Sequence, residues 1–239
     1  MSSDEHVLFL GGSDKERLYL KDDEFVSESG VRVVVRATDI PGVDMRDTVA
    51  RHKARYFQLG LFCRPDLRVL DFPCGSGYAA EVLGPLHVSY TGLDFDRTTV
   101  EYAKRTYGRY RAGYDVGDLR NPELARESYD VVGCIEGLEH IELDRQDGLI
   151  SALRDALVPG GVLVVSSPEA RSGVSGPSAD NPYHLGELTR SDFLSLLSRH
   201  FKPSEIEVVT QEATLTTGYR NTCLYGICHK PEQGSHAAA

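Results

Sequence analysis

The sequence predicts an α/β fold, with a doubly wound, mostly parallel sheet of seven strands and helices on its faces. From about residue 68 onward, short apolar segments of strand periodicity alternate with amphipathic segments of helical periodicity, which indicates repeated βαβ units. The connections are short, and turn residues such as Pro159-Gly160-Gly161 separate the segments. A glycine-rich turn directly follows the first apolar segment, as in nucleotide-binding α/β domains.

The elements of this main domain follow in chain order. The predicted strands are 68–72, 89–95, 112–118, 129–136, 161–167, 204–212 and 221–230, and the predicted helices are 78–84, 96–108, 144–158 and 190–201. Asp96 is a candidate N-cap for the second helix, which is expected to end at Gly108. The helix 144–158 has apolar residues at the i, i+3, i+4 and i+7 spacing of a buried face.

Three regions are expected along the chain. Residues 1–67 form an N-terminal extension, in which 18–26 and 30–37 can pair as a hairpin and 46–62 form an amphipathic helix. That helix would end beside the glycine turn, so the extension would cover the site. Residues 68–230 form the main domain, and the alanine-rich residues 231–239 are expected to fray.

Composition narrows the function. With 239 residues, the chain can bury one α/β core plus an extension. The 26 Lys and Arg against 36 Asp and Glu give a net charge of −10, which argues against a nucleic-acid partner and slightly favours an amine-bearing substrate. The five cysteines are expected to be reduced thiols. The absence of a leader pattern and of a membrane-length apolar run predicts a cytoplasmic protein without a membrane partner.

The stretch VLDFPCGSGYAAEVL, residues 69–83, carries the glycine turn. Gly75 and Gly77 allow the backbone to approach a ligand and to adopt φ values that other residues avoid. Asp94 ends the following strand, where its carboxylate can accept hydrogen bonds from both hydroxyls of a ribose. These features suit any adenosine-bearing cofactor.

Further residues narrow the choice of cofactor. Asp71 lies inside the first strand, where it can order the turn and face a cationic group of the ligand. The motif Val116-Gly117-Asp118-Leu119 puts Asp118 at the end of the third strand, where it can bind an adenine amino group. With LVPGGVLVVSSPE at 157–169, these motifs resemble the class I S-adenosylmethionine-dependent methyltransferases over about residues 68–201. The resemblance implies a Rossmann-like methyltransferase enzyme with S-adenosylmethionine as its cofactor.

The glycine turn departs from the family pattern D-x-G-C-G-x-G at one position. Pro73 replaces the first glycine, and because proline has no N–H, neighbouring amides are expected to contact the cofactor. Tyr78 is expected over the cofactor or against the sheet, and Phe95 beside the adenine. The predicted cofactor-binding residues are Asp71, Pro73, Gly75, Gly77, Tyr78, Asp94, Phe95, Asp118, Leu119 and Glu136. A dinucleotide oxidoreductase is disfavoured because no hydride-transfer set such as Tyr-x-x-x-Lys is found.

Two motifs are expected at the methyl-accepting edge. CIEGLEHI supplies Glu136, Glu139 and His140, and DNPYHLGELT supplies Tyr183 and His184. The combination E-x-x-E-H followed by N-P-[YF]-H resembles a bacterial methyltransferase branch associated with sugars and secondary metabolites. It is also similar to ubiquinone-pathway O-methyltransferases and small-RNA 2′-O-methyltransferases.

The same resemblance implies a metal site. Glu136, Glu139, His140 and His184 would hold a divalent ion, with Mg²⁺, Mn²⁺ and Zn²⁺ all compatible with mixed carboxylate and imidazole ligands. In the alternative, Glu136 faces the methionine part of the cofactor, and Glu139 and His140 cap the next helix or order the loop.

The sequence therefore predicts methyl transfer to nitrogen or oxygen of a small polar metabolite, best a sugar or aminoglycoside-like amino sugar in antibiotic or other natural-product biosynthesis. His140 is the favoured base, with Glu136, Tyr183 and His184 near the acceptor. The alternatives are metal-assisted O-methylation of a substrate with vicinal oxygens, and a catalytically inactive cofactor-binding partner protein.

The expected partner is a small-molecule substrate, and the formation of a homodimer is left open. Arg51, Arg55 and Tyr56 are expected on a solvated basic face of the helix 46–62, with contact to the substrate or to the cofactor carboxylate as the alternative. His52 has no convergent partner residues in the sequence.

Overall fold

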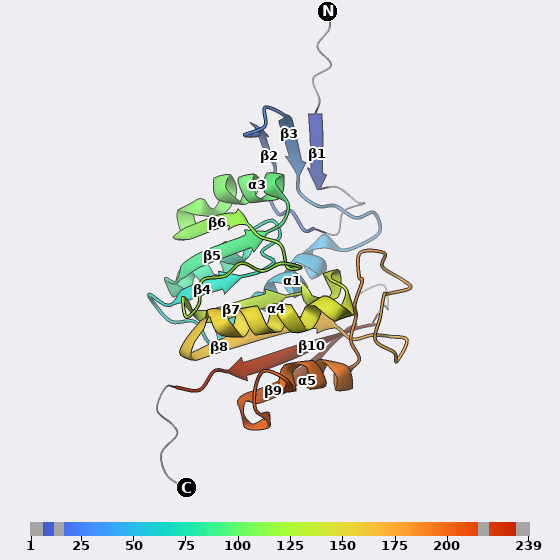
Figure 1. Ribbon diagram of the computed structural model, residues 1–239. Coiled ribbons are helices and arrows are strands. Elements are labelled where there is room, and N and C mark those ends of the chain that lie inside the picture. Colours follow the sequence, from blue (N-terminus) through green and yellow to red (C-terminus); the bar gives the residue numbers. More distant parts are fainter. Residues whose placement is uncertain (1–6, 12–16, 215–219, 233–239) are drawn as a thin grey trace, which may run out of the picture.

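The computed structural model describes residues 7–11, 17–214 and 220–232. Its main sheet has seven strands in the order β6-β5-β4-β7-β8-β10-β9 (Figure 1). The strands are β4 (Arg68–Asp71), β5 (Ser89–Asp94), β6 (Ala112–Val116), β7 (Tyr129–Ile135), β8 (Leu157–Pro168), β9 (Ile206–Thr214) and β10 (Arg220–His229). β10 runs antiparallel to both β8 and β9, and the other neighbours are parallel. The predicted Rossmann-like, mostly parallel sheet is confirmed.

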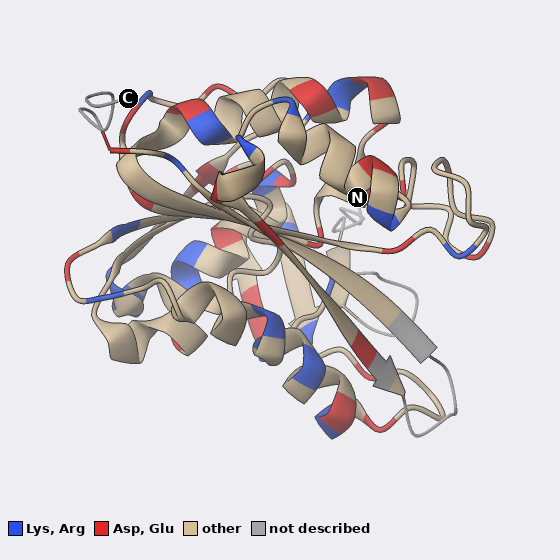
Figure 2. Cartoon of the chain, turned by 90° about the horizontal axis from the view of Figure 1, so that it is seen from below, with Lys and Arg blue, Asp and Glu red and all other residues tan. Residues whose placement is uncertain are grey.

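Helices cover both faces of this sheet. α1 (Met45–Gly60), α2 (Ala79–Leu83) and α3 (Arg97–Tyr107) pack on one face, and α4 (Leu143–Ala156) and α5 (Arg190–Ser198) on the other. Side chains alternate along a strand, so Val69 of β4 joins the first apolar core and Leu70 the second. Figure 2 shows the consequence, since most charged residues lie on helices and loops while the central strands are largely tan.

Short turns and caps complete the domain. The 3₁₀ turns are η1 (Gly84–Leu86), η2 (Gly108–Tyr110), η3 (Leu138–His140) and η4 (Pro203–Glu205). The Asp96 side chain accepts a hydrogen bond from the Thr99 amide at 2.9 Å and caps α3, as the sequence predicts. The cap fixes where the chain leaves β5 and therefore where Asp94 and Phe95 lie.

The Pro159-Gly160-Gly161 segment differs from the prediction, because it is part of β8 and not a turn before it. The pairing of β7 with β8 shifts between Tyr129 and Val131, which marks a bulge. Gly160 has a φ of 80°, and its amide donates to the Lys230 carbonyl at 2.9 Å. Hydrogen bonds of Gly160 and Gly161 to Lys230, in the chain after β10, hold this bulged segment at the edge of the sheet.

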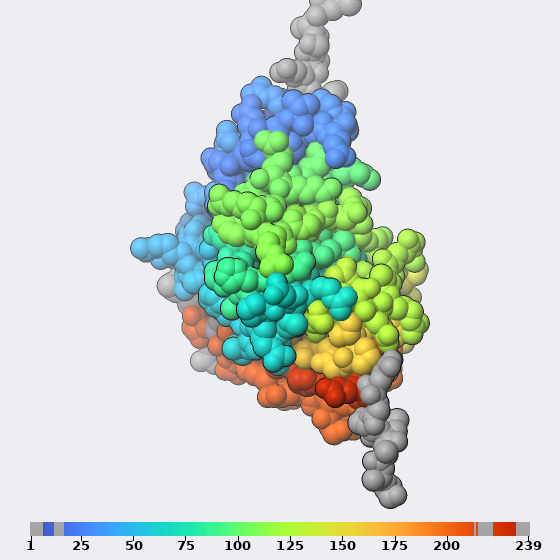
Figure 3. Space-filling model, turned by 90° about the vertical axis from the view of Figure 1, so that its left-hand side faces the viewer, coloured from blue at the N-terminus to red at the C-terminus, as the bar shows by residue number. Residues whose placement is uncertain are grey.

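The N-terminal extension forms a second, three-stranded sheet in the order β1-β3-β2, at the β6 end of the main sheet (Figures 1 and 3). β2 (Asp23–Val26) and β3 (Arg32–Arg36) form the predicted antiparallel hairpin. β1 (Val7–Gly11) pairs in parallel with β3, which the sequence did not predict. The Tyr102 hydroxyl of α3 donates to the Lys21 carbonyl at 2.8 Å, so the extension is packed against the main domain.

Parts of the predicted regions lie outside the described residues. These are 1–6, 12–16, 215–219 and 233–239, which include most of the tail that the sequence predicts to fray. Among the described helices, none has both the length and the apolar character needed to cross a bilayer.

Candidate active site

A cavity of about 1260 Å³ lies where β4, β5, β6, β7 and β8 end. Ligand pockets in proteins commonly measure roughly 300–1,000 Å³, so this one has room for a nucleoside cofactor and a small acceptor together. Most of the residues that the sequence predicts for the site line it: Pro73, Gly75, Tyr78, Asp94, Phe95, Asp118, Leu119, Glu136, Glu139, His140, Tyr183 and His184. Asp71 and Gly77 are not among its lining residues.

The two glycines of the turn have different tasks. Gly75 has a φ of 53°, and a Cβ placed on it would meet nothing within 4 Å. Its backbone is therefore open to a ligand in the cavity. Gly77 has a φ of 85°, and a Cβ there would lie 2.6 Å from the Ala103 Cβ, which makes glycine necessary for the turn to pack on α3.

The Asp94 carboxylate lines the cavity beside the glycine turn and is only 2% exposed. One oxygen accepts the Gly75 amide at 3.1 Å, and the other accepts the Asp96 amide at 3.0 Å. Arg17, from the extension, also donates to this second oxygen at 2.6 Å. Burial raises the pKa of Asp94, and the charge of Arg17 opposes that rise.

Asp71 is placed differently from its predicted position facing a cationic group of the ligand. It points to the same side of β4 as Val69, where it is fully buried and accepts the Tyr90 hydroxyl at 2.6 Å. Burial raises its pKa to about 7. The alternation of side chains along β4 explains the difference, because it directs Asp71 into the core and away from the cavity.

Replacing Asp71 with asparagine is expected to stabilise the fold at pH 8. An aspartate in an unfolded chain ionises near pH 4, whereas Asp71 in the folded protein ionises near pH 7. The folded protein therefore binds the proton more tightly, and its stability falls as the pH rises from about 4 to about 7. We expect urea unfolding to show a gain of about 2–4 kcal/mol for Asp71→Asn at pH 8, shrinking toward pH 5.

The affinity of this variant for S-adenosylhomocysteine should stay within a few fold of the parent, because Asp71 is not on the cavity wall. A large loss of affinity in the folded variant would instead support the predicted contact of Asp71 with the ligand.

Loops after β5 and β6 line another part of the cavity, where the sequence predicts the adenine. Phe95 is 64% exposed and lines the cavity together with Asp118 and Leu119. One oxygen of Asp118 accepts the Arg120 amide at 2.9 Å, which fixes the loop. The predicted contact of Asp118 with an adenine amino group stays a prediction.

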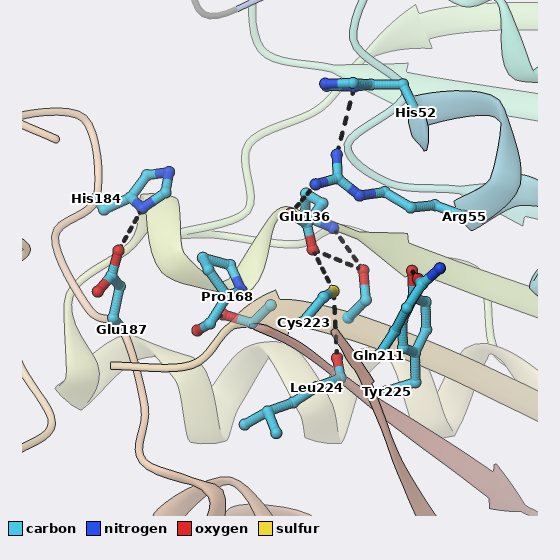
Figure 4. A network of polar contacts seen from close by, with 12 residues as sticks. His52, Arg55, Glu136, Pro168, His184, Glu187, Gln211, Cys223, Leu224 and Tyr225 are labelled. Atoms are coloured by element: carbon cyan, nitrogen blue, oxygen red, sulfur yellow. Dashed lines mark hydrogen bonds and ion pairs between the residues drawn. The ribbon is translucent and has the colours of Figure 1, made fainter. Parts of the chain in front are cut away.

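Glu136 follows β7 directly and has a left-handed φ of 51°, which is uncommon for glutamate. Its carboxylate forms an ion pair with Arg55 at 2.8 Å and accepts the Cys223 thiol at 3.0 Å (Figure 4). It also accepts the Ser166 hydroxyl at 3.1 Å. The Arg55 side chain is 9% exposed. Glu136 is therefore fixed by partners from α1, β8 and β10.

This network corrects the predicted solvated face on α1. Arg55 is in the buried stripe of the helix with Tyr56 and Leu59. Arg51 and His52 line the cavity, and His52 Nδ1 lies 3.3 Å from the Arg55 guanidinium. Burial and the neighbouring arginines lower the pKa of His52 well below its usual value, so its imidazole is neutral at pH 7. The helical spacing of Arg55 relative to the apolar residues of α1 could have predicted that it is buried.

The cavity wall also holds a cluster of Glu139, His140 and His184, which we call the Glu-His-His cluster. One ligand atom of each side chain lies within 4.8 Å of the others. Glu139 is 1% exposed, and its Oε2 has no hydrogen-bond partner within the described residues. Burial and the charge of Glu136 raise the pKa of Glu139 well above its usual value. A cation in this cluster would stabilise the ionised carboxylate.

Both imidazoles of the cluster are oriented through Nδ1. His140 Nδ1 lies 3.2 Å from the Tyr183 carbonyl, and His184 Nδ1 lies 2.6 Å from the Glu187 carboxylate. Because a carbonyl only accepts, His140 Nδ1 carries a proton, and the carboxylate oxygen of Glu187 as acceptor favours the same tautomer of His184. The lone pair of each neutral ring is then on Nε2, as in histidines that bind metals.

Backbone hydrogen bonds join the two chain segments that form the cluster. The Glu139 carbonyl in η3 accepts the Leu185 amide at 2.7 Å and the Gly186 amide at 3.0 Å. Gln146 of α4 donates to the Leu138 carbonyl at 3.0 Å and to the Gly186 carbonyl at 2.7 Å. These bonds hold the loop after β8 against η3, although 45 residues separate His140 from Leu185 in the chain.

The Glu-His-His cluster meets the chemical requirements of a divalent metal site. It supplies two imidazole nitrogens and one carboxylate oxygen, which suit Zn²⁺ or Mn²⁺ better than the oxygen-rich shell that Mg²⁺ prefers. Glu136, the fourth ligand that the sequence predicts, is not in the cluster, because Arg55, Ser166 and Cys223 engage its carboxylate.

Comparison with known proteins identifies the family. A family described as "Methyltransferase domain" matches residues 44–212, from the N-cap of α1 to the last strand but one. The chain belongs to this methyltransferase family. A probable S-adenosylmethionine-dependent methyltransferase of Mycolicibacterium smegmatis is 32% identical over 148 residues, which cover 62% of this chain and 56% of the relative. The aligned region thus spans little more than half of that relative.

Other relatives carry more specific names. A ubiquinone biosynthesis O-methyltransferase of Idiomarina loihiensis is 27% identical over 180 residues, covering 73% of this chain and 69% of the relative. The N-methyltransferase NodS of Bradyrhizobium japonicum, solved with S-adenosylhomocysteine, has a TM-score of 0.58 and 20% identity, covering 77% of this methyltransferase and 87% of NodS. The [4+2]-cyclase SpnF has a TM-score of 0.59 and 15% identity, covering 75% of this chain and 82% of SpnF.

These findings confirm the class I S-adenosylmethionine-dependent methyltransferase family and support S-adenosylmethionine as the cofactor. They leave the sugar branch as a prediction. NodS and SpnF are at most 20% identical to this chain, so the similarity shows only the fold. Because one of the two is named as a cyclase, the fold alone does not determine the reaction.

Several site residues were missed by sequence reasoning. Glu187 stands three residues after His184, a spacing that could have indicated a partner for the imidazole. Ser166 and Cys223 are far from Glu136 in the chain. Ser166 reaches it through the pairing of β7 with β8, and Cys223 through the further pairing of β8 with β10. No sequence motif contains Arg17, so its contact with Asp94 could not be predicted.

Proposed function

We propose that this protein transfers the methyl group of S-adenosylmethionine to a hydroxyl oxygen of a small polyhydroxylated metabolite, best a sugar. The observation that supports an oxygen acceptor is the Glu-His-His cluster, placed in the same cavity as the glycine turn and Asp94. Two neighbouring hydroxyls of a sugar can be held at such a cluster while one of them faces the cofactor.

The part of the cavity around Asp94 and Gly75 would bind and orient the cofactor. Asp94 binds the ribose hydroxyls, and the open backbone at Gly75 allows the methionine part to lie close to the turn. The methyl group is already activated by the positive sulfur, so alignment with the attacking oxygen and exclusion of water supply most of the catalysis. As the oxygen–carbon bond forms, the carbon–sulfur bond breaks and S-adenosylhomocysteine is left.

The part of the cavity around the Glu-His-His cluster would bind the acceptor hydroxyl and remove its proton. Glu139, His140 and His184 would hold a divalent ion, and Glu187 and the Tyr183 carbonyl would orient the two imidazoles. When bound, such an ion lowers the pKa of a coordinated hydroxyl. Without an ion, His140 Nε2 is the group that accepts the hydroxyl proton, and the Tyr183 carbonyl stabilises the resulting imidazolium.

An amine acceptor, such as an amino sugar, is the second candidate. Glu169 and Asp180 also line the cavity and add carboxylates to its wall. An ammonium group would be attracted there and would have to lose a proton before transfer. The experiment described next distinguishes the two candidates, because its panel of acceptors contains both sugars and amino sugars.

The experiment incubates the full chain with methyl-labelled cofactor and a panel of sugars, amino sugars and catechols, followed by mass spectrometry of the products. Exhaustive EDTA treatment, checked by elemental analysis, is expected to abolish turnover and to leave the affinity for S-adenosylhomocysteine within about twofold. Restored turnover on adding Mn²⁺ or Zn²⁺ supports the cluster as a metal site.

Full turnover in metal-depleted protein would contradict the metal and leave His140 as the base. Methylated nitrogen in every product would contradict the oxygen acceptor. A protein that binds S-adenosylhomocysteine but methylates nothing in the panel would contradict the sugar assignment and favour a partner protein without catalysis.

A further inference from the structure

We propose that Arg17 is a gate on the cofactor pocket, because its guanidinium occupies the place where the adenosine of the cofactor must bind. The proposal rests on S-adenosylmethionine being the ligand of Asp94. It gives the N-terminal extension a role beyond covering the site, namely setting the fraction of the protein that can accept the cofactor.

The contacts of Arg17 coincide with the predicted contacts of adenosine. Its Nη2 lies 2.6 Å from Asp94 Oδ1, and its Nη1 lies 4.0 Å from the Asp96 carboxylate. Its guanidinium carbon lies 4.8 Å from the centre of the Phe95 ring, the surface expected to flank adenine. One side chain therefore covers both the ribose carboxylate and the adenine platform.

Asp94 cannot serve Arg17 and a ribose at the same time. Its two oxygens also accept the amides of Gly75 and Asp96, and the residue is 2% exposed. A carboxylate offers about four lone-pair positions, and a bound ribose needs two of them directed into the cavity. The guanidinium stands on that side, so it has to leave before both ribose hydroxyls can bind.

The backbone next to Arg17 is anchored while its side chain is partly exposed. The Ser76 hydroxyl of the glycine turn donates to the Leu18 carbonyl at 2.6 Å, and the Tyr19 hydroxyl is 2.8 Å from Thr99 Oγ1 in α3. Tyr19 is 2% exposed, whereas the Arg17 side chain is 28% exposed. Rotation of the Arg17 side chain toward solvent opens the pocket without breaking these anchors.

The gate lowers the apparent affinity for the cofactor. A ligand that binds only the open state has its affinity reduced by the fraction of protein in that state. An arginine paired with a buried carboxylate and stacked on an aromatic ring keeps that fraction low. The extension thereby couples its own packing to cofactor binding.

The test measures binding of S-adenosylhomocysteine to the full chain by calorimetry. Arg17→Met is expected to tighten binding by about tenfold, and Arg17→Lys to give an intermediate value, since lysine makes only a point contact with Asp94. The matched control is Arg97→Met, because Arg97 is exposed and pairs weakly with Glu28 at 4.0 Å, outside the cavity lining. The control should bind as the parent does.

The association rate gives a second readout. Mixing with S-adenosylhomocysteine is expected to give a rate that levels off at high ligand concentration in the parent, and a faster rate that does not level off in Arg17→Met. The levelling in the parent tests the gate even if Arg17→Met fails to fold, and thermal melting reports folding of each variant.

Unchanged or weaker binding by a folded Arg17→Met variant would overturn the gate and would make Arg17 a bystander or a cofactor-binding residue. A parent chain that does not bind S-adenosylhomocysteine at any concentration would instead contradict the cofactor assignment itself. The two failures are therefore distinguishable.

Discussion

Replacing Asp94 with alanine is expected to weaken binding of S-adenosylhomocysteine by at least about 100-fold. The carboxylate is expected to accept both ribose hydroxyls, and each hydrogen bond to a charged group contributes roughly 1.5–3 kcal/mol. A loss of about 3 kcal/mol corresponds to slightly more than 100-fold in the dissociation constant. Calorimetry on the folded variant measures the change.

The ion pair of Asp94 with Arg17 affects the size of this loss of affinity. Asp94→Ala also removes the contact that holds Arg17 over the pocket, which offsets part of the loss. We therefore expect a larger loss when Asp94→Ala is compared with its parent in the Arg17→Met background. Asp94→Asn keeps the shape and serves as the milder variant, and an unchanged affinity in folded Asp94→Ala would rule out the ribose contact.

Replacing His184 with alanine is expected to lower kcat by at least about 100-fold and to remove bound metal. The imidazole is held by Glu187 at 2.6 Å and supplies one of three donors in the Glu-His-His cluster. Glu187→Gln removes the charge that orients the ring and should reduce metal affinity by about 10- to 100-fold. Titration with Mn²⁺ and Zn²⁺, followed by turnover assays, measures both effects.

His200→Ala is the matched control, because His200 pairs with Asp147 at 3.0 Å and does not line the cavity. Glu139→Gln adds a sharper test. Glu139 is buried, and one of its oxygens has no hydrogen-bond partner among the residues that the structure describes. Removing its charge should therefore leave the metal-free protein at least as stable as the parent while it weakens metal binding. Normal metal binding by both cluster variants would exclude the site.

Most of the fold could be predicted because strand and helix periods are strong local signals. The β4, β5 and β7 strands and the Asp96 cap of α3 all come from short sequence patterns. β1 was not predicted, because its five residues are stabilised by pairing with β3, about 25 residues away. The bulge of β8 likewise depends on the chain after β10.

The candidate site was predictable where motifs carry it. The positions of Asp94, Gly75, Glu139, His140 and His184 follow from the rule that parallel strands present their carboxyl ends at one edge. The direction of each side chain did not follow. Asp71 turns into the core because strand residues alternate between faces, and that depends on which face of β4 is covered by α1 to α3.

By itself, the sequence determined that this chain forms a Rossmann-like methyltransferase domain with a glycine turn, an acidic residue after the second main-sheet strand, and glutamate and histidine residues at the acceptor edge. Local periodicity and short motifs encode these features. Only the tertiary structure decided that Arg55 neutralises Glu136, that Glu187 orients His184 and that Arg17 covers Asp94. The Arg55–Glu136 and Arg17–Asp94 pairs join charges that folding brings together from separate elements, and no local pattern records which buried charge meets which partner. Glu187 is only three residues from His184, but this spacing by itself does not show that the two side chains are in contact.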